Sequence, residues 1–151
     1  MKKQLTRVNI GCLVCCALAL MLLFLQFVPF WPNGEAGEMA SISQYIWFPG
    51  DCTGVETMLK TTLGSDYTIN QMVMGPLLLL VLCVVCAALC LFKQNNLIAP
   101  VLAAITGLVG MVVYIGSAPM HQGQFWVVHL AGSVMLMLCG IVTTYWRLTT
   151  K

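Results

Sequence analysis

The run MVMGPLLLLVLCVVCAALCLF, from Met72 to Phe92, decides the fold of this chain. It contains no Asp, Glu, Lys or Arg, and it is close to the roughly 20 residues that cross about 30 Å of hydrocarbon as a helix. In hydrocarbon every backbone N–H and C=O must be paired within its own segment, so a helix is the only plausible state. Three further runs share these properties, namely Val8–Val28, Ile98–Ala118 and Phe125–Trp146.

The composition requires lipid around these runs. Of the 151 residues, 60% are hydrophobic and 8% are charged, whereas roughly 25% of the residues in a soluble domain are charged. A chain of this size cannot hide so much apolar surface in its own core. We therefore predict an all-α integral membrane protein with a single domain, residues 1–151, folded as an antiparallel bundle of four transmembrane helices. We expect the lipid bilayer as a partner and no nucleic acid, because the Lys and Arg residues are not clustered.

The positively and negatively charged residues fall on opposite sides of the predicted membrane. If the spans alternate in direction, six of the seven Lys and Arg residues fall on one side, and all five Asp and Glu residues fall on the other side with Lys60. An excess of Lys and Arg near span ends marks the cytoplasmic face. We therefore expect both termini in the cytoplasm and residues 29–71 as one larger extracytoplasmic loop. We expect a plasma or bacterial inner membrane, because the chain is minimal and has no glycosylation sequon.

Loop 29–71 contains the clearest local signal outside the spans. Thr53 and Glu56 have the spacing of a capping box, and apolar residues follow at helical intervals until Gly64. The pattern predicts a short amphipathic helix at about Gly54–Leu63, lying across the outer ends of the bundle. The residues that we consider candidates for binding a partner lie on this helix or before it, and they are Trp47, Phe48, Asp51, Cys52 and Met58.

Eight cysteines are many for this length, and seven of them lie in the predicted inner halves of spans. Cys12-x-x-Cys15 and Cys83-x-x-Cys86 have the spacing of metal or redox motifs. A thiol in hydrocarbon is inert, so we expect these cysteines to act as small apolar residues in helix packing, with no cofactor. The alternative is a metal site, for which the candidate ligands are Cys83, Cys86, Cys90 and His129.

The third span carries a row of small residues, Ala99, Ala103 and Gly107, which lets another helix approach closely. Such a row can form the seam of a dimer or can pack within one bundle. We expect packing within one bundle.

What the spans lack bears on function. No carboxylate or guanidinium lies in any span, so the usual proton relay or ion-coupling site is missing. The chain also has no P-loop, Gly-x-Ser-x-Gly or His-Glu-x-x-His motif. These absences favour a non-enzymatic accessory or scaffold subunit that binds another membrane protein, or further copies of itself. The alternatives are a thiol-redox or metal-binding membrane protein that uses the inner-half cysteines, and a small oligomeric pore.

The layout of one span, a large loop and three linked spans resembles that of claudin-type tetraspan proteins. Their first outer loop mediates contacts and carries a Trp and a pair of cysteines, whereas here Trp47 is followed by Cys52 alone. The layout also resembles that of four-helix membrane thiol oxidoreductases of the DsbB type. Those enzymes keep cysteine pairs at the outer surface, where this chain has Cys52 only, so we assign the chain to neither family.

Overall fold

A computed structural model describes residues 2–28, 31–32, 39–41, 47, 57, 61, 69–116 and 125–149. Within these residues the chain forms four long helices, each long and apolar enough to cross a membrane. The predicted all-helical architecture with four candidate spans is thereby confirmed. The helices are α1 (Lys2–Leu25), α4 (Ile69–Phe92), α5 (Ile98–Gly116) and α6 (Phe125–Thr149).

α1, α4 and α6 are longer than the apolar runs that predicted them. α1 begins at Lys2 rather than at Val8, and α6 continues past Trp146 to Thr149. A helix forms its backbone hydrogen bonds outside the hydrocarbon as well as within it. The helices can therefore continue into polar residues, which a hydropathy pattern does not include in a span. The predicted end of the third span, at Ala118, lies outside the described residues.

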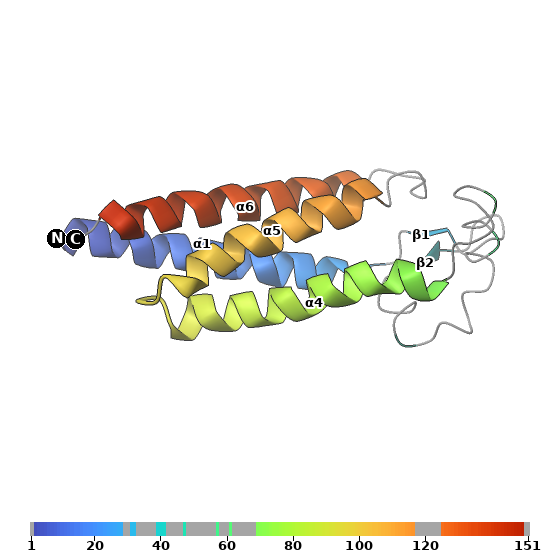
Figure 1. Ribbon diagram of the computed structural model, residues 1–151, viewed down its shortest axis with the longest axis horizontal. Helices are drawn as coiled ribbons and strands as arrows, with labels where there is room; N and C mark the ends of the chain where they lie inside the picture. Colours follow the sequence, from blue (N-terminus) through green and yellow to red (C-terminus); the bar gives the residue numbers. More distant parts are fainter. Residues whose placement is uncertain are drawn as a thin grey trace.

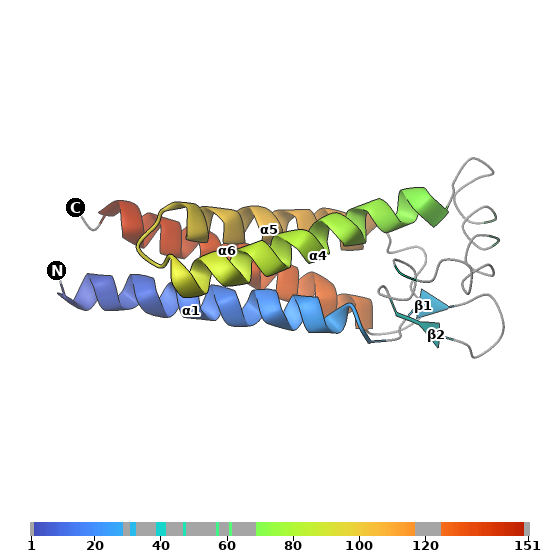
Figure 2. The same ribbon diagram turned by 90° about the horizontal axis from the view of Figure 1, so that it is seen from below.

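The four helices run side by side along the bundle, and neighbouring helices are antiparallel (Figure 1). Their contacts close a ring. α1 and α5 each pack against both α4 and α6, whereas α1 and α5 lie across the ring from each other. Both termini and the link 93–97 lie towards one end of the bundle, and α1 and α4 meet loop 29–71 at the other (Figures 1 and 2). We name these the link end and the loop end.

Each helix turns a seam of buried residues towards the bundle axis. Along each seam, buried residues recur at steps of three or four, which keeps them on one helix face. Many of their side chains are small or polar. The seams are Val8, Cys12, Cys15, Ala19 and Leu22 on α1, with Gln26 directly after it; Pro76, Leu79, Cys83, Cys86 and Cys90 on α4; Ala99, Ala103, Thr106, Gly110 and Tyr114 on α5; and His129, Ser133, Leu136, Gly140 and Thr143 on α6.

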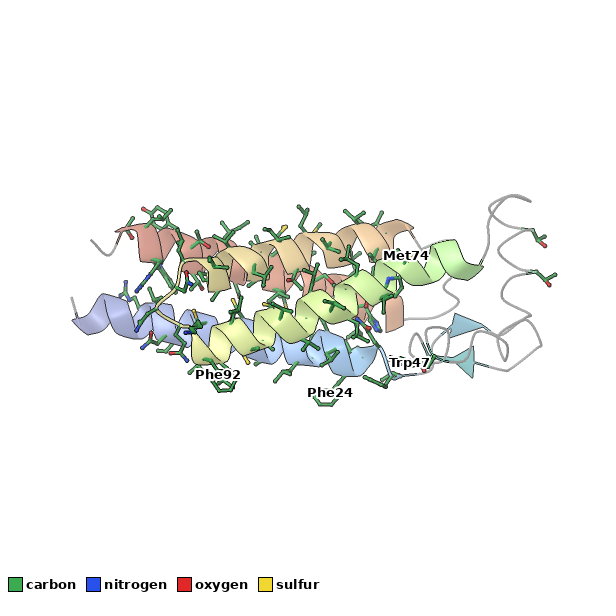
Figure 3. All side chains as sticks on the ribbon, turned by 60° about the horizontal axis from the view of Figure 1, so that its bottom comes forward. Phe24, Trp47, Met74 and Phe92 are labelled. Atoms are coloured by element: carbon green, nitrogen blue, oxygen red, sulfur yellow. The ribbon has the colours of Figure 1, made fainter. Side chains whose placement is uncertain are left out.

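Large apolar side chains point away from the axis. Phe24, Phe92 and Val112 expose 67%, 77% and 65% of their surface. Figure 3 shows Phe24 and Phe92 projecting from the outside of the bundle. In water so much contiguous apolar surface would be a binding or aggregation site. Small residues inside and large ones outside instead suit a bundle whose sides contact lipid tails.

α5 and α6 approach each other closely at two glycines. A Cβ atom on Gly107 would overlap the α6 backbone at Met137, and one on Gly140 would overlap the α5 backbone at Ala104. The small-residue face of α5, which includes the buried Ala103, therefore packs against α6 within the bundle.

Pro76 lies inside a helix. α4 begins at Ile69, before the predicted start at Met72, so Pro76 is well past the first turn. Proline has no N–H to donate, and the helical hydrogen bond to the carbonyl of residue 72 is therefore missing. Membrane helices tolerate such breaks where neighbouring groups are at hand.

The link end is held by polar contacts. The Asn96 side-chain oxygen accepts a hydrogen bond of 3.1 Å from the Ile98 N–H, which caps the start of α5. The Arg147 guanidinium donates to the Asn95 carbonyl and so ties the last turns of α6 to the link.

The structure describes two short strands in loop 29–71. β1 (Trp31–Pro32) pairs antiparallel with β2 (Met39–Ala40), a two-residue pairing that hydropathy did not predict. The predicted helix Gly54–Leu63 lies outside the described residues except at Thr57 and Thr61. There the Thr61 hydroxyl donates a hydrogen bond of 2.7 Å to the Thr57 carbonyl.

Gly140→Ala tests the close packing of α5 on α6. We expect its thermal unfolding midpoint in detergent to fall by several degrees, because the added methyl must push the helices apart at about 1–3 kcal/mol. Gly116→Ala is the matched control, since a Cβ there meets nothing within 4 Å, and its midpoint should not fall. Equal midpoints for the two variants would contradict this packing.

Candidate functional site

Four cysteine side chains meet where the seams of α1 and α4 face each other. The Cys90 thiol on α4 lies close to the thiols of Cys12, Cys15 and Cys86. All four side chains are buried. The antiparallel packing of α1 on α4 brings the pairs together, because an early residue of α1 faces a late residue of α4. We name Cys12, Cys15, Cys86 and Cys90 the thiol cluster.

Carbonyl groups at the link end surround the thiol cluster. The Cys12 Sγ donates to the Gln94 carbonyl at 3.9 Å, and the Cys90 Sγ donates to the Ala99 carbonyl at 3.7 Å. The Cys86 thiol also lies near Thr106 of α5. The thiol cluster therefore lies just inside the link, and Cys12 contacts the link itself.

Three further cysteines border the thiol cluster. Cys83 lies on the α4 seam one step towards the loop end, and Cys16 lies beside Cys15 on α1; both are buried. Cys139 on α6 is partly buried. None of the cysteines in the described ranges forms a disulfide. The reduced thiol cluster thus has several sulfur neighbours and no covalent link.

The four candidate metal ligands do not lie together. Cys86 and Cys90 belong to the thiol cluster, whereas His129 contacts the α1 backbone at Leu25. Leu25 follows Cys12 by 13 residues, a separation of about 20 Å along a helix. Among the described residues, no three or more His, Cys, Asp or Glu side chains are arranged to hold a metal ion.

Two members of the thiol cluster were absent from the candidate metal ligands. The sequence places Cys12 and Cys15 in the inner half of the first span and Cys86 and Cys90 in the inner half of the second, but it does not show which helix faces meet. In an antiparallel pair of spans, cysteines near the start of one helix and near the end of the next lie at the same membrane depth.

The loop end of the bundle contains a second group of buried polar side chains. His129 Nε2 lies 3.1 Å from the Leu25 carbonyl, and the rings of His129 and Tyr114 are 4.8 Å apart at 52°. Gln26, which follows the end of α1, is fully buried, and neither its amide oxygen nor its amide nitrogen has a hydrogen-bond partner among the described residues. A buried amide without partners costs free energy, so packing alone does not explain this residue.

Two hollows open on the described surface. A polar hollow of about 630 Å³ lies beside the link and is lined by Asn9 together with residues 91–97. An apolar groove of about 250 Å³ lies between α1 and α6. Its walls include Val14, Val142 and Trp146.

The candidates for partner binding lie almost entirely outside the described residues. Trp47 is the exception, and it exposes 64% of its surface. Figure 3 shows Trp47 at the loop end of the bundle. Phe48, Asp51, Cys52 and Met58 are not among the described residues.

No protein-family model, no curated protein and no solved structure matches this chain. The function proposed below is therefore argued from the residues of the chain itself.

Gln26→Leu tests the unpaired buried amide. We expect this variant to unfold in detergent at a higher temperature than the unaltered protein, gaining about 1–3 kcal/mol, because an unsatisfied polar group is replaced by an apolar one of similar size. Thr106→Val is the comparison, since the Thr106 hydroxyl is paired with the Leu102 carbonyl at 2.7 Å. It should give no such gain. A lower midpoint for Gln26→Leu would show that the amide makes a stabilising contact.

Proposed function

We propose that this chain is a non-enzymatic accessory or scaffold subunit of a plasma or bacterial inner membrane. It binds a partner membrane protein through loop 29–71 at the loop end. A further copy of the chain can take the place of that partner.

The observation that carries this proposal is the character of the bundle interior. None of the buried side chains in the described helices is Asp, Glu, Lys or Arg. Two of the interior hydroxyls bond within their own helices, from Thr106 to the Leu102 carbonyl at 2.7 Å and from Ser133 to the His129 carbonyl at 2.9 Å. Proton relays and ion pathways in membranes use chains of ionisable groups that face the bundle interior, whereas the buried His129 lies against the Leu25 carbonyl at 3.1 Å. Such an interior favours a structural role over transport.

The exposed Trp47 supports partner binding at the loop end. Tryptophan is enriched among the residues that contribute most to protein interfaces, because it combines a large apolar ring with a hydrogen-bond donor. With 64% of its surface exposed, Trp47 gains by burial against a partner. It belongs to the same segment as Asp51 and Met58, which supply a charge and a flexible apolar side chain.

The orientation follows from the cations. Lys93 is exposed in the link, Arg147 lies in the last turn of α6, and Lys2 begins α1. All three therefore belong to the link end. Cationic residues at span ends are retained in the cytoplasm, so the link end faces the cytoplasm and the loop end faces outwards.

Photo-crosslinking in intact membranes tests the partner. With p-benzoylphenylalanine in place of Trp47, we expect a specific higher-mass adduct after irradiation, because the exposed ring position contacts the partner. The control is the same replacement at Leu148, which is 57% exposed but lies at the link end. The mass of the adduct distinguishes a second copy from another protein. Recovery of Trp47-labelled monomer alone would count against the proposal.

Reporter fusions test the orientation. A fluorescent protein that folds only in the cytoplasm should be active when fused after Lys151, and alkaline phosphatase, which is active only outside, should be active when inserted after Glu56. Reversal of both signals would overturn the orientation. Activity of both sites in one compartment would contradict the alternation of the spans.

A further inference from the structure

The thiol cluster is richer in sulfur than packing requires. Helices that approach closely need small residues, and α5 and α6 supply them with Ala99, Ala103 and Gly140. Alanine would serve the same purpose on α1 and α4. Instead these two helices place three thiols close to that of Cys90, two of them from α1 and one from α4 itself.

We propose that the thiol cluster is a reversible dithiol–disulfide site that links α1 to α4. Cys90 is one partner, and Cys12 or Cys15 is the other. The reduced form is the one in the structure, in which the thiols are free. Because Cys90 lies close to both Cys12 and Cys15, the linkage can move between them by thiol–disulfide exchange.

The oxidant is a small neutral peroxide, for which hydrogen peroxide is the simplest member. The Cys12 sulfur attacks one peroxide oxygen, the O–O bond breaks, and the products are a sulfenic acid on Cys12 and water. The Cys90 sulfur then attacks the sulfenic sulfur, an S–S bond forms, and the hydroxyl leaves with the Cys90 proton as a second water. Two thiols and one peroxide thus give one disulfide and two waters, with both sulfurs oxidised and both peroxide oxygens reduced.

Cys12 is the thiol placed to react first. Its Sγ contacts the Gln94 carbonyl in the link, where the apolar helix ends. The Arg147 guanidinium donates to the Asn95 carbonyl, so a positive charge lies at the same end of the bundle as Cys12. A nearby positive charge stabilises the negative charge that develops on an attacking sulfur. Cys90 serves as the resolving thiol.

The linkage would fasten the two helices that flank loop 29–71. A disulfide restricts the unfolded chain more as the closed loop lengthens, and the one from Cys12 to Cys90 encloses the whole of loop 29–71. In the proposed orientation the thiol cluster lies at the cytoplasmic end, where thiols are normally kept reduced. The linked form then accumulates only under oxidative conditions, and the linkage itself does not depend on that orientation.

The test counts free thiols in the full-length protein in membranes. In a Cys52→Ser background, which removes the cysteine of loop 29–71, membranes are treated with hydrogen peroxide or buffer. They are then denatured and labelled with a maleimide polymer that retards each labelled thiol on a gel. We expect peroxide to remove two labelled thiols per chain, and dithiothreitol to restore both. Peptide mass spectrometry should map the linkage to Cys90 with Cys12 or Cys15.

Two variants and the peptide map keep the proposal falsifiable. Cys139→Ser is the matched control, because Cys139 borders the thiol cluster without belonging to it, and it should still lose two thiols. In Cys90→Ser, peroxide should cause no thiol loss that dithiothreitol reverses. If this variant does not fold, the peptide map of the Cys52→Ser protein shows whether Cys90 forms the disulfide. The proposal is overturned if peroxide leaves every thiol free, if the loss is not reversed by dithiothreitol, or if the linkage maps to other cysteines.

Discussion

The hydrocarbon core of a bilayer offers no hydrogen bonds to a polypeptide backbone, and the structure follows from that constraint. Each apolar run must pair its own N–H and C=O groups and therefore becomes a helix. Since lipid tails are as apolar as leucine, hydrophobicity does not drive the helices together. Association depends instead on close contact, which explains why small residues such as Ala103, Gly107 and Gly140 face inwards while Phe24 and Phe92 face outwards.

Close contact between helices has a second effect, because it brings together side chains that lie far apart in the sequence. α1 and α4 are separated by a long loop, yet their antiparallel packing sets Cys12 beside Cys90. At the other end, the same packing principle sets the start of α6 beside the end of α1, where His129 reaches the Leu25 carbonyl. The buried Gln26 lies next in the chain, so two polar side chains reach a region where lipid would not solvate them. The two ends of the bundle are therefore chemically distinct, with sulfur at one and nitrogen and oxygen at the other.

The architecture could be predicted from the sequence because an uncharged run such as Met72–Phe92 has one plausible conformation in lipid. The helix ends could not, since Lys2 to Arg7 are helical without being apolar. The sequence places the members of the thiol cluster in the inner halves of the first two spans. The approach of Cys90 to Cys12 and Cys15 depends on helix register, which no local pattern encodes. The same reason explains why His129 was grouped with cysteines that lie far from it. Loop 29–71 has no repeating pattern to constrain its pairing, and the two-residue bridge at Trp31 was missed.

Pro76 gives the bundle a mechanical property. It interrupts the hydrogen-bond ladder of α4 one or two turns from the end that receives loop 29–71, and proline is a common cause of bending in helices. With one backbone hydrogen bond fewer, Pro76 is the point at which α4 bends at the least cost in free energy. Bending there would shift the segment Ile69–Gly75, which meets the outer loop, and would leave the seam from Leu79 to Cys90 in place.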